Sequence, residues 1–332
     1  MSAPGPFVAP SADPALEEGI RTGLASVEAM LHETVKSSFP FVTETSRHLV
    51  DAGGKRFRPL LVLLASRFGD AEAPGVVPSA VVVELTHLAT LYHDDVMDEA
   101  DLRRGAESAN ARWDNTVAIL TGDFLFARAS DILADLGPEA VRLQARTFER
   151  LVTGQIRETV GPAQGEDPVE HYLSVLADKT GSLIATSARF GAMLSGAPDD
   201  VVDVLTRFGE RIGIAFQLSD DLLDVLSDTS ESGKVPGTDL REGVPTLPVL
   251  LLRRMDRPED RRLRSLLDAG LTDQADHAEA LRLLRANPAV AQAQAEVKRW
   301  ADDARESLGP LPSGPAKDAL AALCDQVVGR TT

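Results

Sequence analysis

Residues 85–98 of this chain read LTHLATLYHDDVMD, and residues 212–224 read IGIAFQLSDDLLD. In each stretch apolar residues recur at helical intervals and then give way to an aspartate cluster of the form DDxxD. The first and last aspartates of such a cluster are four residues apart, so on a helix they lie one turn apart on the same face. Each stretch therefore predicts an amphipathic helix that ends in paired carboxylates.

The rest of the chain has the same helical character. From about residue 14 onward Ala and Leu dominate with apolar spacings of three and four, and no convincing alternating strand pattern occurs. Glycine and proline clusters such as Gly53-Gly54, Gly137-Pro138 and Pro236-Gly237 separate the helical segments. The pattern predicts an all-α protein with roughly a dozen helices of ordinary length.

The predicted domain organisation is simple. Residues 1–14, MSAPGPFVAPSADP, are rich in Pro, Ala and Ser, so we expect a disordered tail there. The stretches between the later helices are too short to separate independent modules. We therefore expect residues 15–332 to form a single large helical bundle, in which facing helices project side chains into a shared core.

Composition excludes several classes of function. The 34 basic and 51 acidic residues give a net charge of −17, which repels nucleic acid and anionic membrane surfaces. No apolar run approaches the ~20 residues of a membrane-spanning helix, and the N-terminus lacks the features of a signal peptide. The one cysteine, Cys324, lies in an Ala/Leu-rich stretch and is expected to serve packing. We expect a cytoplasmic protein that is not integral to a membrane.

The two aspartate clusters point to a metal. Like charges one turn apart destabilise a helix, so each cluster needs a compensating cation. Carboxylate oxygens with few His or Cys nearby suit Mg²⁺, whose coordination is usually completed by waters and substrate phosphates. One DDxxD alone in an acidic protein is most often a solvated helix end. Two in one chain predict a diphosphate held through Mg²⁺ between two facing helices.

A basic segment, GGKRFRP at residues 53–59, leads into the apolar stretch LLVLLASRF. Its proline suits a first helical turn, and its two glycines allow the backbone to approach a ligand closely. Lys55 and Arg58 are then expected at a helix N-terminus, where cations and N–H groups favour phosphate. The alternative is a basic loop that only turns the chain.

Three further side chains flank the first aspartate cluster. Arg103 and Arg104 follow it, and adjacent guanidinium groups can reach two different anions. His87 lies seven residues before Asp94, on the same helical face, where its ring could donate to a phosphate. Taken singly, the arginines could equally form a screened surface ion pair, and the histidine could be an ordinary buried one.

Together these motifs resemble the trans-isoprenyl diphosphate synthase (polyprenyl synthetase) family over nearly the whole chain. The resemblance implies an all-α fold around a deep hydrophobic tunnel, a homodimer, and a requirement for Mg²⁺ with three ions per active site. It implies a prenyltransferase that condenses isopentenyl diphosphate with an allylic diphosphate, head to tail and all-trans.

The same resemblance implies roles for individual positions. Isopentenyl diphosphate would be bound by Gly54, Lys55, Arg58, His87 and Arg104. Magnesium would be bound by Asp94, Asp98 and Asp220, with support from Asp95, Asp221 and Asp224. The allylic diphosphate would be contacted by Arg103, Lys179, Gln217 and Lys234, and Thr180 and Gln217 would lie near the developing allylic cation. Many relatives carry DLxEGKxTLP after the second cluster, but here Val244 occupies the lysine position, so one phosphate contact is expected to be missing.

Product length should depend on the room below Asp94. Ala89 and Thr90, five and four residues before it, offer no bulky aromatic side chain to block a growing product. This predicts a medium- or long-chain polyprenyl diphosphate. The alternative is a geranylgeranyl or farnesyl diphosphate, with Phe124 or Phe126 closing the tunnel deeper down.

Three other classes of protein compete with a synthase. A terpene cyclase shares aspartate-rich motifs but has no need of a second diphosphate pocket, which GGKRFRP and its companions predict here. Non-catalytic subunits of heteromeric synthases typically resemble the family but have lost aspartates, whereas this chain keeps all six. A helical scaffold without a ligand leaves the clustered like charges unexplained.

Overall fold

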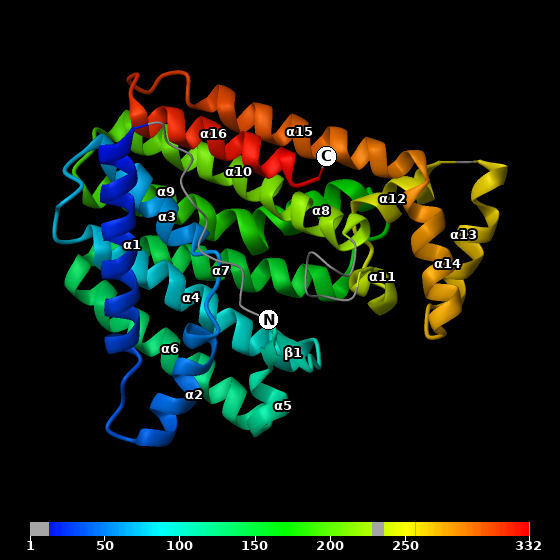
Figure 1. Ribbon diagram of the computed structural model, residues 1–332, viewed down its shortest axis with the longest axis horizontal. Coiled ribbons are helices and arrows are strands. Elements are labelled where there is room, and N and C mark those ends of the chain that lie inside the picture. The colour runs from blue at the N-terminus through cyan, green and yellow to red at the C-terminus, as the bar shows by residue number, and fades with distance from the viewer. Residues whose placement is uncertain (1–12, 228–235, 256, 332) are drawn as a thin grey trace. The chain divides into compact units, whose positions relative to one another are not determined.

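A computed structural model of the chain describes residues 13–227, 236–255 and 257–331. Within these ranges the protein consists of sixteen α-helices, short 3₁₀ and π-helical turns, and one hairpin of two-residue strands (Figure 1). The predicted all-α fold is confirmed, with more helices than the sequence suggested. None of the described helices is both long enough and apolar enough to cross a bilayer.

The described residues form two compact units. The first unit comprises the described parts of Met1–Glu149, Leu183–Gly209 and Ser307–Ala322, and the second those of Arg150–Ser182, Glu210–Glu306 and Leu323–Thr332. The expectation of a single domain over residues 15–332 stays a prediction. The first aspartate cluster belongs to the first unit and the second cluster to the second unit.

The first unit is built around a buried helix. Helix α4 (Val76–Met97) is apolar on every side for most of its length, which is typical of a helix enclosed by others. It contacts its neighbours α1, α3, α5 and α6. The other elements of this unit are α1 (Pro14–Thr34), α2 (Pro40–Asp51), α3 (Phe57–Ala65), α5 (Ala109–Trp113), α6 (Asn115–Leu136), most of α9 (Ser182–Leu194) and the first parts of α7 (Pro138–Val160), α10 (Asp199–Leu226) and α16 (Pro315–Gly329).

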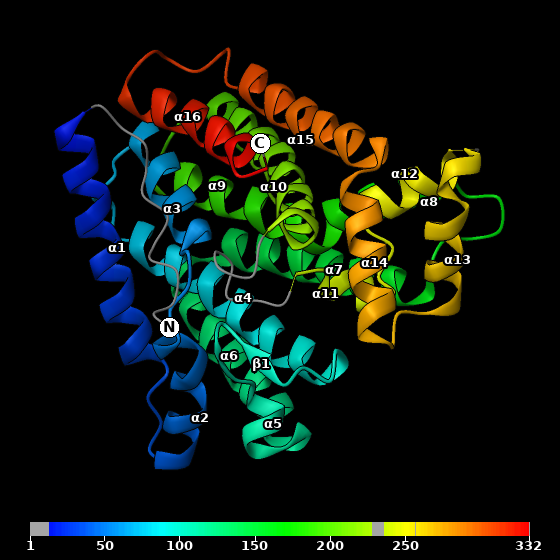
Figure 2. The same ribbon diagram turned by 45° about the vertical axis from the view of Figure 1, so that its right-hand side comes forward.

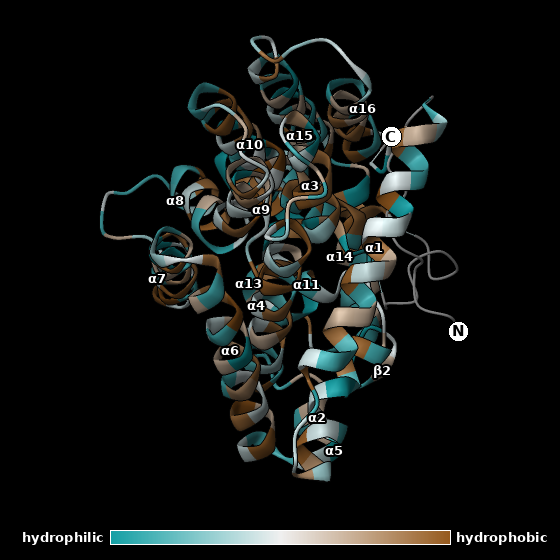
Figure 3. Ribbon diagram, turned by 90° about the vertical axis from the view of Figure 1, so that its left-hand side faces the viewer, coloured by the Kyte–Doolittle hydropathy of each residue, from teal (hydrophilic) through white to brown (hydrophobic). Residues whose placement is uncertain are grey.

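Helices α1 and α3 show how sequence pattern sets burial. Helix α1 is amphipathic, with bands of both colours in Figure 3, and it buries Leu16, Ile20, Val27 and Leu31. Helix α3 is different, because every one of its residues except Arg58 is buried. Burial of α3 on all sides fixes the position of its N-terminus, where the basic segment GGKRFRP begins the helix.

A short hairpin follows α4. Strand β1 (Leu102–Arg103) pairs antiparallel with β2 (Ala106–Glu107). The two residues between them, Arg104 and Gly105, both have positive φ, of 53° and 78°, as tight hairpin turns require. The turn thereby places Arg103 and Arg104 just past the end of α4, as predicted.

The second unit holds the remaining helices. These are the later parts of α7, α10 and α16, together with α8 (Pro168–Leu176), α11 (Thr238–Glu242), α12 (Leu247–Arg254), α13 (Arg261–Ala269), α14 (Gln274–Arg285) and α15 (Pro288–Ser307). Helix α14 contacts α13 and α11 (Figure 2). The one cysteine, Cys324, is fully buried on α16, in agreement with the predicted packing role, and burial raises the pKa of its thiol to about 12.

Candidate active site

The first aspartate cluster lies where α4 ends. Asp94 and Asp95 occupy the last turn, and Asp98 is the residue that closes the helix. The side chain of Asp95 is fully buried, and it accepts a 2.5 Å hydrogen bond from Nε of Arg103. Arg103 also lies 3.4 Å from a carboxylate oxygen of Asp98. Burial alone would lower the pKa of Arg103, but the adjacent Asp95 carboxylate raises it above its ordinary value.

The chemistry of this cluster fits a hard divalent cation. Asp94 is half-buried and the Asp98 side chain is 52% exposed, so both carboxylates can be reached from solvent. They stand at the negative end of the α4 dipole, where a bound cation is favoured. Among the described residues, no group of three or more His, Cys, Asp or Glu side chains could hold a metal ion. Magnesium, which accepts waters and phosphate oxygens, suits such a partial set of oxygen ligands.

The basic segment GGKRFRP separates its three cations. Arg56 adopts the left-handed conformation, with φ of 48°, as it enters α3, and its side chain turns inward to become almost fully buried. Lys55 and Arg58 on either side of it remain partly exposed. The predicted placement of these two cations at a helix N-terminus is therefore what the structure shows.

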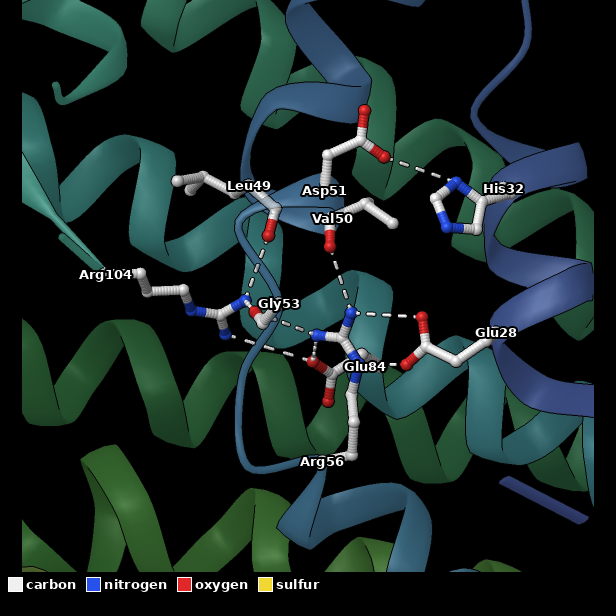
Figure 4. A network of polar contacts seen from close by, with 9 residues as sticks. All are labelled: Glu28, His32, Leu49, Val50, Asp51, Gly53, Arg56, Glu84 and Arg104. Carbon is white, nitrogen blue, oxygen red and sulfur yellow. Dashed lines mark hydrogen bonds and ion pairs between the residues drawn. The ribbon is translucent and has the colours of Figure 1, made fainter. Parts of the chain in front are cut away.

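Arg104 reaches from the hairpin to this segment (Figure 4). Its Nη1 donates to the backbone oxygen of Leu49 at 3.0 Å and also to that of Gly53. A Cβ atom added to Gly54 would lie 2.9 Å from the guanidinium carbon of Arg104. The second glycine of the segment thus makes room for Arg104, a close approach that the sequence attributed to a ligand.

His87 lies on α4 two turns before the aspartates. Burial lowers its pKa well below the ordinary value, and the positive charges of Arg58 and Arg104, then of Arg56 and Arg103, lower it further. The imidazole is therefore neutral at physiological pH and can donate a hydrogen bond without adding charge. The guanidinium groups of Arg56, Arg58 and Arg104 thus form a cationic cluster around His87 within the first unit, which attracts anions.

The second aspartate cluster is embedded in a chain of hydrogen bonds. The hydroxyl of Thr180 donates to Oε1 of Gln217 at 3.1 Å, and Nε2 of Gln217 donates to Asp221 at 2.8 Å. The hydroxyl of Tyr172 donates to the other carboxylate oxygen of Asp221. Burial raises the pKa of Asp221 from 3.8 to about 6, against the lowering effect of these two hydrogen bonds, and the neighbouring Asp220 raises it further. Three predicted site residues therefore meet in the second unit.

Lys179 and Thr180 occupy a special piece of backbone. They lie in Ala177–Gly181, a π-helical turn that joins α8 to α9. Such turns frequently occur at functional sites. The ammonium group of Lys179 lies 2.5 Å from a carboxylate oxygen of Glu158 on α7.

The remaining aspartates of the second cluster have structural partners. Both carboxylate oxygens of Asp224 accept backbone N–H groups, from Thr238 at 3.1 Å and Asp239 at 3.0 Å, and so cap the start of α11. Asp220 pairs with the guanidinium of Arg330, which also lies 5.2 Å above the ring of Phe216. Lys234, a predicted phosphate contact, lies outside the described residues.

Some contributors were missed by the sequence analysis. Arg330 comes from the far end of the chain, and no spacing links it to the second cluster. Tyr172 is one of two tyrosines in the chain. The structure shows it half-buried, and a tyrosine hydroxyl in such a place usually finds a hydrogen-bond partner. Glu84 is almost fully buried on α4 one turn before His87, and a buried carboxylate in an apolar helix predicts a cationic partner.

Known proteins share both the sequence and the fold. The sequence model of the polyprenyl synthetase family matches residues 39–284, so the chain belongs to this family and is a prenyltransferase. The predicted family, fold class and enzyme class are thereby confirmed.

Individual relatives span different products. The chain is 49% identical to nonaprenyl diphosphate synthase of Mycobacterium tuberculosis, over 96% of this chain and 95% of the relative. It is 38% identical to heptaprenyl diphosphate synthase component 2 of Geobacillus stearothermophilus, over 90% and 92%. The crystal structure of geranylgeranyl pyrophosphate synthase from Corynebacterium glutamicum, complexed with calcium and isoprenyl diphosphate, is 47% identical with a TM-score of 0.86, covering 97% of this chain and 99% of that one.

Proposed function

We propose that this prenyltransferase condenses isopentenyl diphosphate with an allylic diphosphate, head to tail and all-trans, to give a polyprenyl diphosphate of medium or long chain. One observation carries the proposal. The first unit holds both an acidic helix end, at Asp94 and Asp98, and a cationic cluster of Arg56, Arg58 and Arg104 around His87, so it offers groups for two different diphosphates.

Different residues are proposed to bind the metal, the departing diphosphate and the allylic cation. Asp94, Asp98 and Asp220 would hold Mg²⁺, with three ions per site as the family resemblance implies. When bound, the metal would supply Lewis-acid stabilisation of the diphosphate leaving group. Lys179 and Arg103 would neutralise the departing diphosphate. The hydroxyl dipole of Thr180 would face the allylic cation.

The second substrate is proposed to bind at the cationic cluster around His87. Lys55, Arg58 and Arg104 would hold its diphosphate, and the neutral ring of His87 would donate one hydrogen bond. The isopentenyl double bond would then form the new C–C bond to the allylic carbon. The released pyrophosphate would take up the proton lost from the adduct, so the chain itself needs no dedicated base for that step.

Two observations bear on the alternatives. A non-catalytic subunit is disfavoured because all six aspartates are present, although one relative is named as a component of a heptaprenyl diphosphate synthase. A terpene cyclase is disfavoured because the cationic cluster around His87 would have no second diphosphate to bind.

The proposed product length rests on α4. Ala89 is buried and Thr90 is half-buried, and neither carries a bulky side chain. The shorter alternative depends on Phe126, which stacks on Phe148 with ring centroids 4.5 Å apart. Purified protein incubated with Mg²⁺, farnesyl diphosphate and labelled isopentenyl diphosphate should give products longer than geranylgeranyl diphosphate. A sole product of four isoprene units would contradict the long-chain proposal, and Thr90→Phe should shorten whatever product is found.

We also infer that the enzyme is a homodimer. Helix α7 carries a stripe of exposed apolar side chains at helical spacing, namely Val141, Phe148, Val152, Ile156 and Val160. Contiguous exposed apolar surface commonly marks an interface. Light scattering should give the mass of two chains, and a monomer at assay concentration would exclude this assembly.

A further inference from the structure

A buried ion cluster lies beneath the basic segment (Figure 4). It contains two carboxylates and two guanidinium groups, from Glu28, Glu84, Arg56 and Arg104. Glu84 is the centre of the cluster. Its side chain is 2% exposed, it lies one turn before His87, and the reaction described above does not use it.

Arg56 is fully committed to the protein. An arginine has five N–H donors. Those of Arg56 meet both oxygens of Glu28, one oxygen of Glu84 at 2.8 Å, and the backbone oxygens of Gly53 at 3.2 Å and Val50 at 3.1 Å. Arg56 therefore has no donor left for a substrate, and it instead fixes the loop that carries Lys55 and leads into α3, where Arg58 lies.

Arg104 is only partly committed. Its Nη1 donates to the backbone oxygens of Leu49 and Gly53, and its Nη2 lies 3.9 Å from the same oxygen of Glu84 that binds Arg56. Within the described residues hydrogen bonds occupy the two N–H donors of Nη1, and the ion pair with Glu84 orients Nη2, so the donors of Nη2 and Nε remain for an anion. The guanidinium is thus oriented by the protein but retains donors for a ligand.

We propose that Glu84 is a positioning residue for isopentenyl diphosphate: one buried carboxylate anchors Arg56, which fixes the phosphate-binding loop, and at the same time orients Arg104. The inference rests on the proposed function, in which Arg104 and the loop bind that substrate. Gly53 reinforces the arrangement, because its backbone oxygen accepts from both guanidinium groups.

The charge balance separates this idea from simple electrostatics. The charges of the two carboxylates and the two guanidinium groups cancel, so replacing Glu84 by a neutral residue leaves one extra positive charge near His87. If charge alone governed binding of the diphosphate, the variant would bind isopentenyl diphosphate more tightly. If orientation governs binding, the variant binds it more weakly, because the guanidinium donors are no longer held in place.

The test compares Glu84→Gln, Glu84→Asp and the matched control Glu28→Gln. Glu28 contacts Arg56 but not Arg104 in the described contacts, and its side chain is 38% exposed. In the full-length enzyme, Glu84→Gln is expected to raise KM for isopentenyl diphosphate about tenfold, which corresponds to about 1.4 kcal/mol. KM for the allylic diphosphate should change less than about twofold, as should the slow hydrolysis of that substrate without isopentenyl diphosphate.

The two other variants make the result decisive. Glu84→Asp keeps the buried charge, so it retains the fold, but the shorter side chain cannot reach both guanidinium groups, and KM for isopentenyl diphosphate should again rise. Glu28→Gln should lower the melting temperature while leaving both KM values within about twofold.

The positioning role is refuted if KM for isopentenyl diphosphate is unchanged or falls in both Glu84 variants. It is also refuted if Glu28→Gln raises that KM equally, or if the KM values of both substrates rise together. Absence of any condensation by the unaltered protein would instead refute the proposed function.

Discussion

The two DDxxD clusters have the same pattern but neutralise their middle carboxylate in different ways. In the first cluster Asp95 is fully buried and paired with the guanidinium of Arg103. In the second cluster Asp221 receives hydrogen bonds from the uncharged side chains of Tyr172 and Gln217, and its pKa is raised to about 6. The shared motif therefore does not determine how its middle aspartate is compensated. The neighbouring side chains do, through an ion pair at Asp95 and through neutral hydrogen bonds at Asp221.

The largest expected effect concerns what the clusters share. Asp94→Ala and Asp220→Ala should each lower kcat by about 10³-fold or more, because each removes a proposed ligand of a metal worth several kcal/mol to the reaction. If both clusters act on one allylic diphosphate, the double variant should be little slower than the slower single variant. Steady-state assays with circular dichroism as a folding control would check this. Effects that multiply in the double variant would contradict a shared substrate.

In metal-free protein, neutralising the middle aspartate should change the free energy of unfolding differently in the two clusters. Asp95→Asn should lower the free energy of unfolding by roughly 3 kcal/mol at neutral pH, because it leaves the Arg103 guanidinium without its buried partner. Asp221→Asn should cost little or even stabilise at pH 8, since a neutral amide replaces a carboxylate that burial makes costly to ionise. Urea unfolding in the presence of a chelator would measure both values. Equal losses in the two variants would remove the proposed distinction.

The stability difference between the wild type and Asp221→Asn should depend on pH. Because the folded-state pKa of Asp221 is raised from 3.8 to about 6, its stabilising contribution is present at low pH and is lost as pH rises through 6. Between pH 5 and pH 8 the wild type should therefore lose about 1.4 kcal/mol relative to Asp221→Asn. A flat difference between wild type and Asp221→Asn would contradict the raised pKa.

The smallest expected effect concerns the second unit alone. Val244 is 38% exposed and occupies a position where many relatives carry lysine. Val244→Lys should lower KM for the allylic diphosphate about two- to fivefold, the size expected of one solvent-screened charge. KM for isopentenyl diphosphate should stay unchanged. A fall in KM for isopentenyl diphosphate would contradict the prediction, because it would place the lysine near that substrate.

Much of this site could be predicted because it follows helix periodicity. The aspartates end α4 and lie near the end of α10, and Lys55 and Arg58 flank the start of α3, as apolar spacing and the GGKRFRP motif predicted. These relations are local, so sequence distance and spatial distance agree.

The unpredicted features depend on conformation or on distant contacts. Lys55, Arg56 and Arg58 look equivalent in the sequence, and the positive φ of Arg56 sends its side chain inward. The π-helical turn at Lys179 has no periodic signature in the sequence. Arg330 lies 110 residues beyond its partner Asp220, and no local rule relates two such positions.

The burial of Cys324 has a practical consequence for spectroscopy. Its side chain is wholly enclosed on α16 and its pKa is about 12, so almost no thiolate exists at neutral pH to react with a maleimide. Since the chain contains one cysteine, a new cysteine on an exposed surface would be the only readily labelled thiol. Fluorophores or spin labels could therefore be attached at chosen positions during turnover without first replacing any native residue.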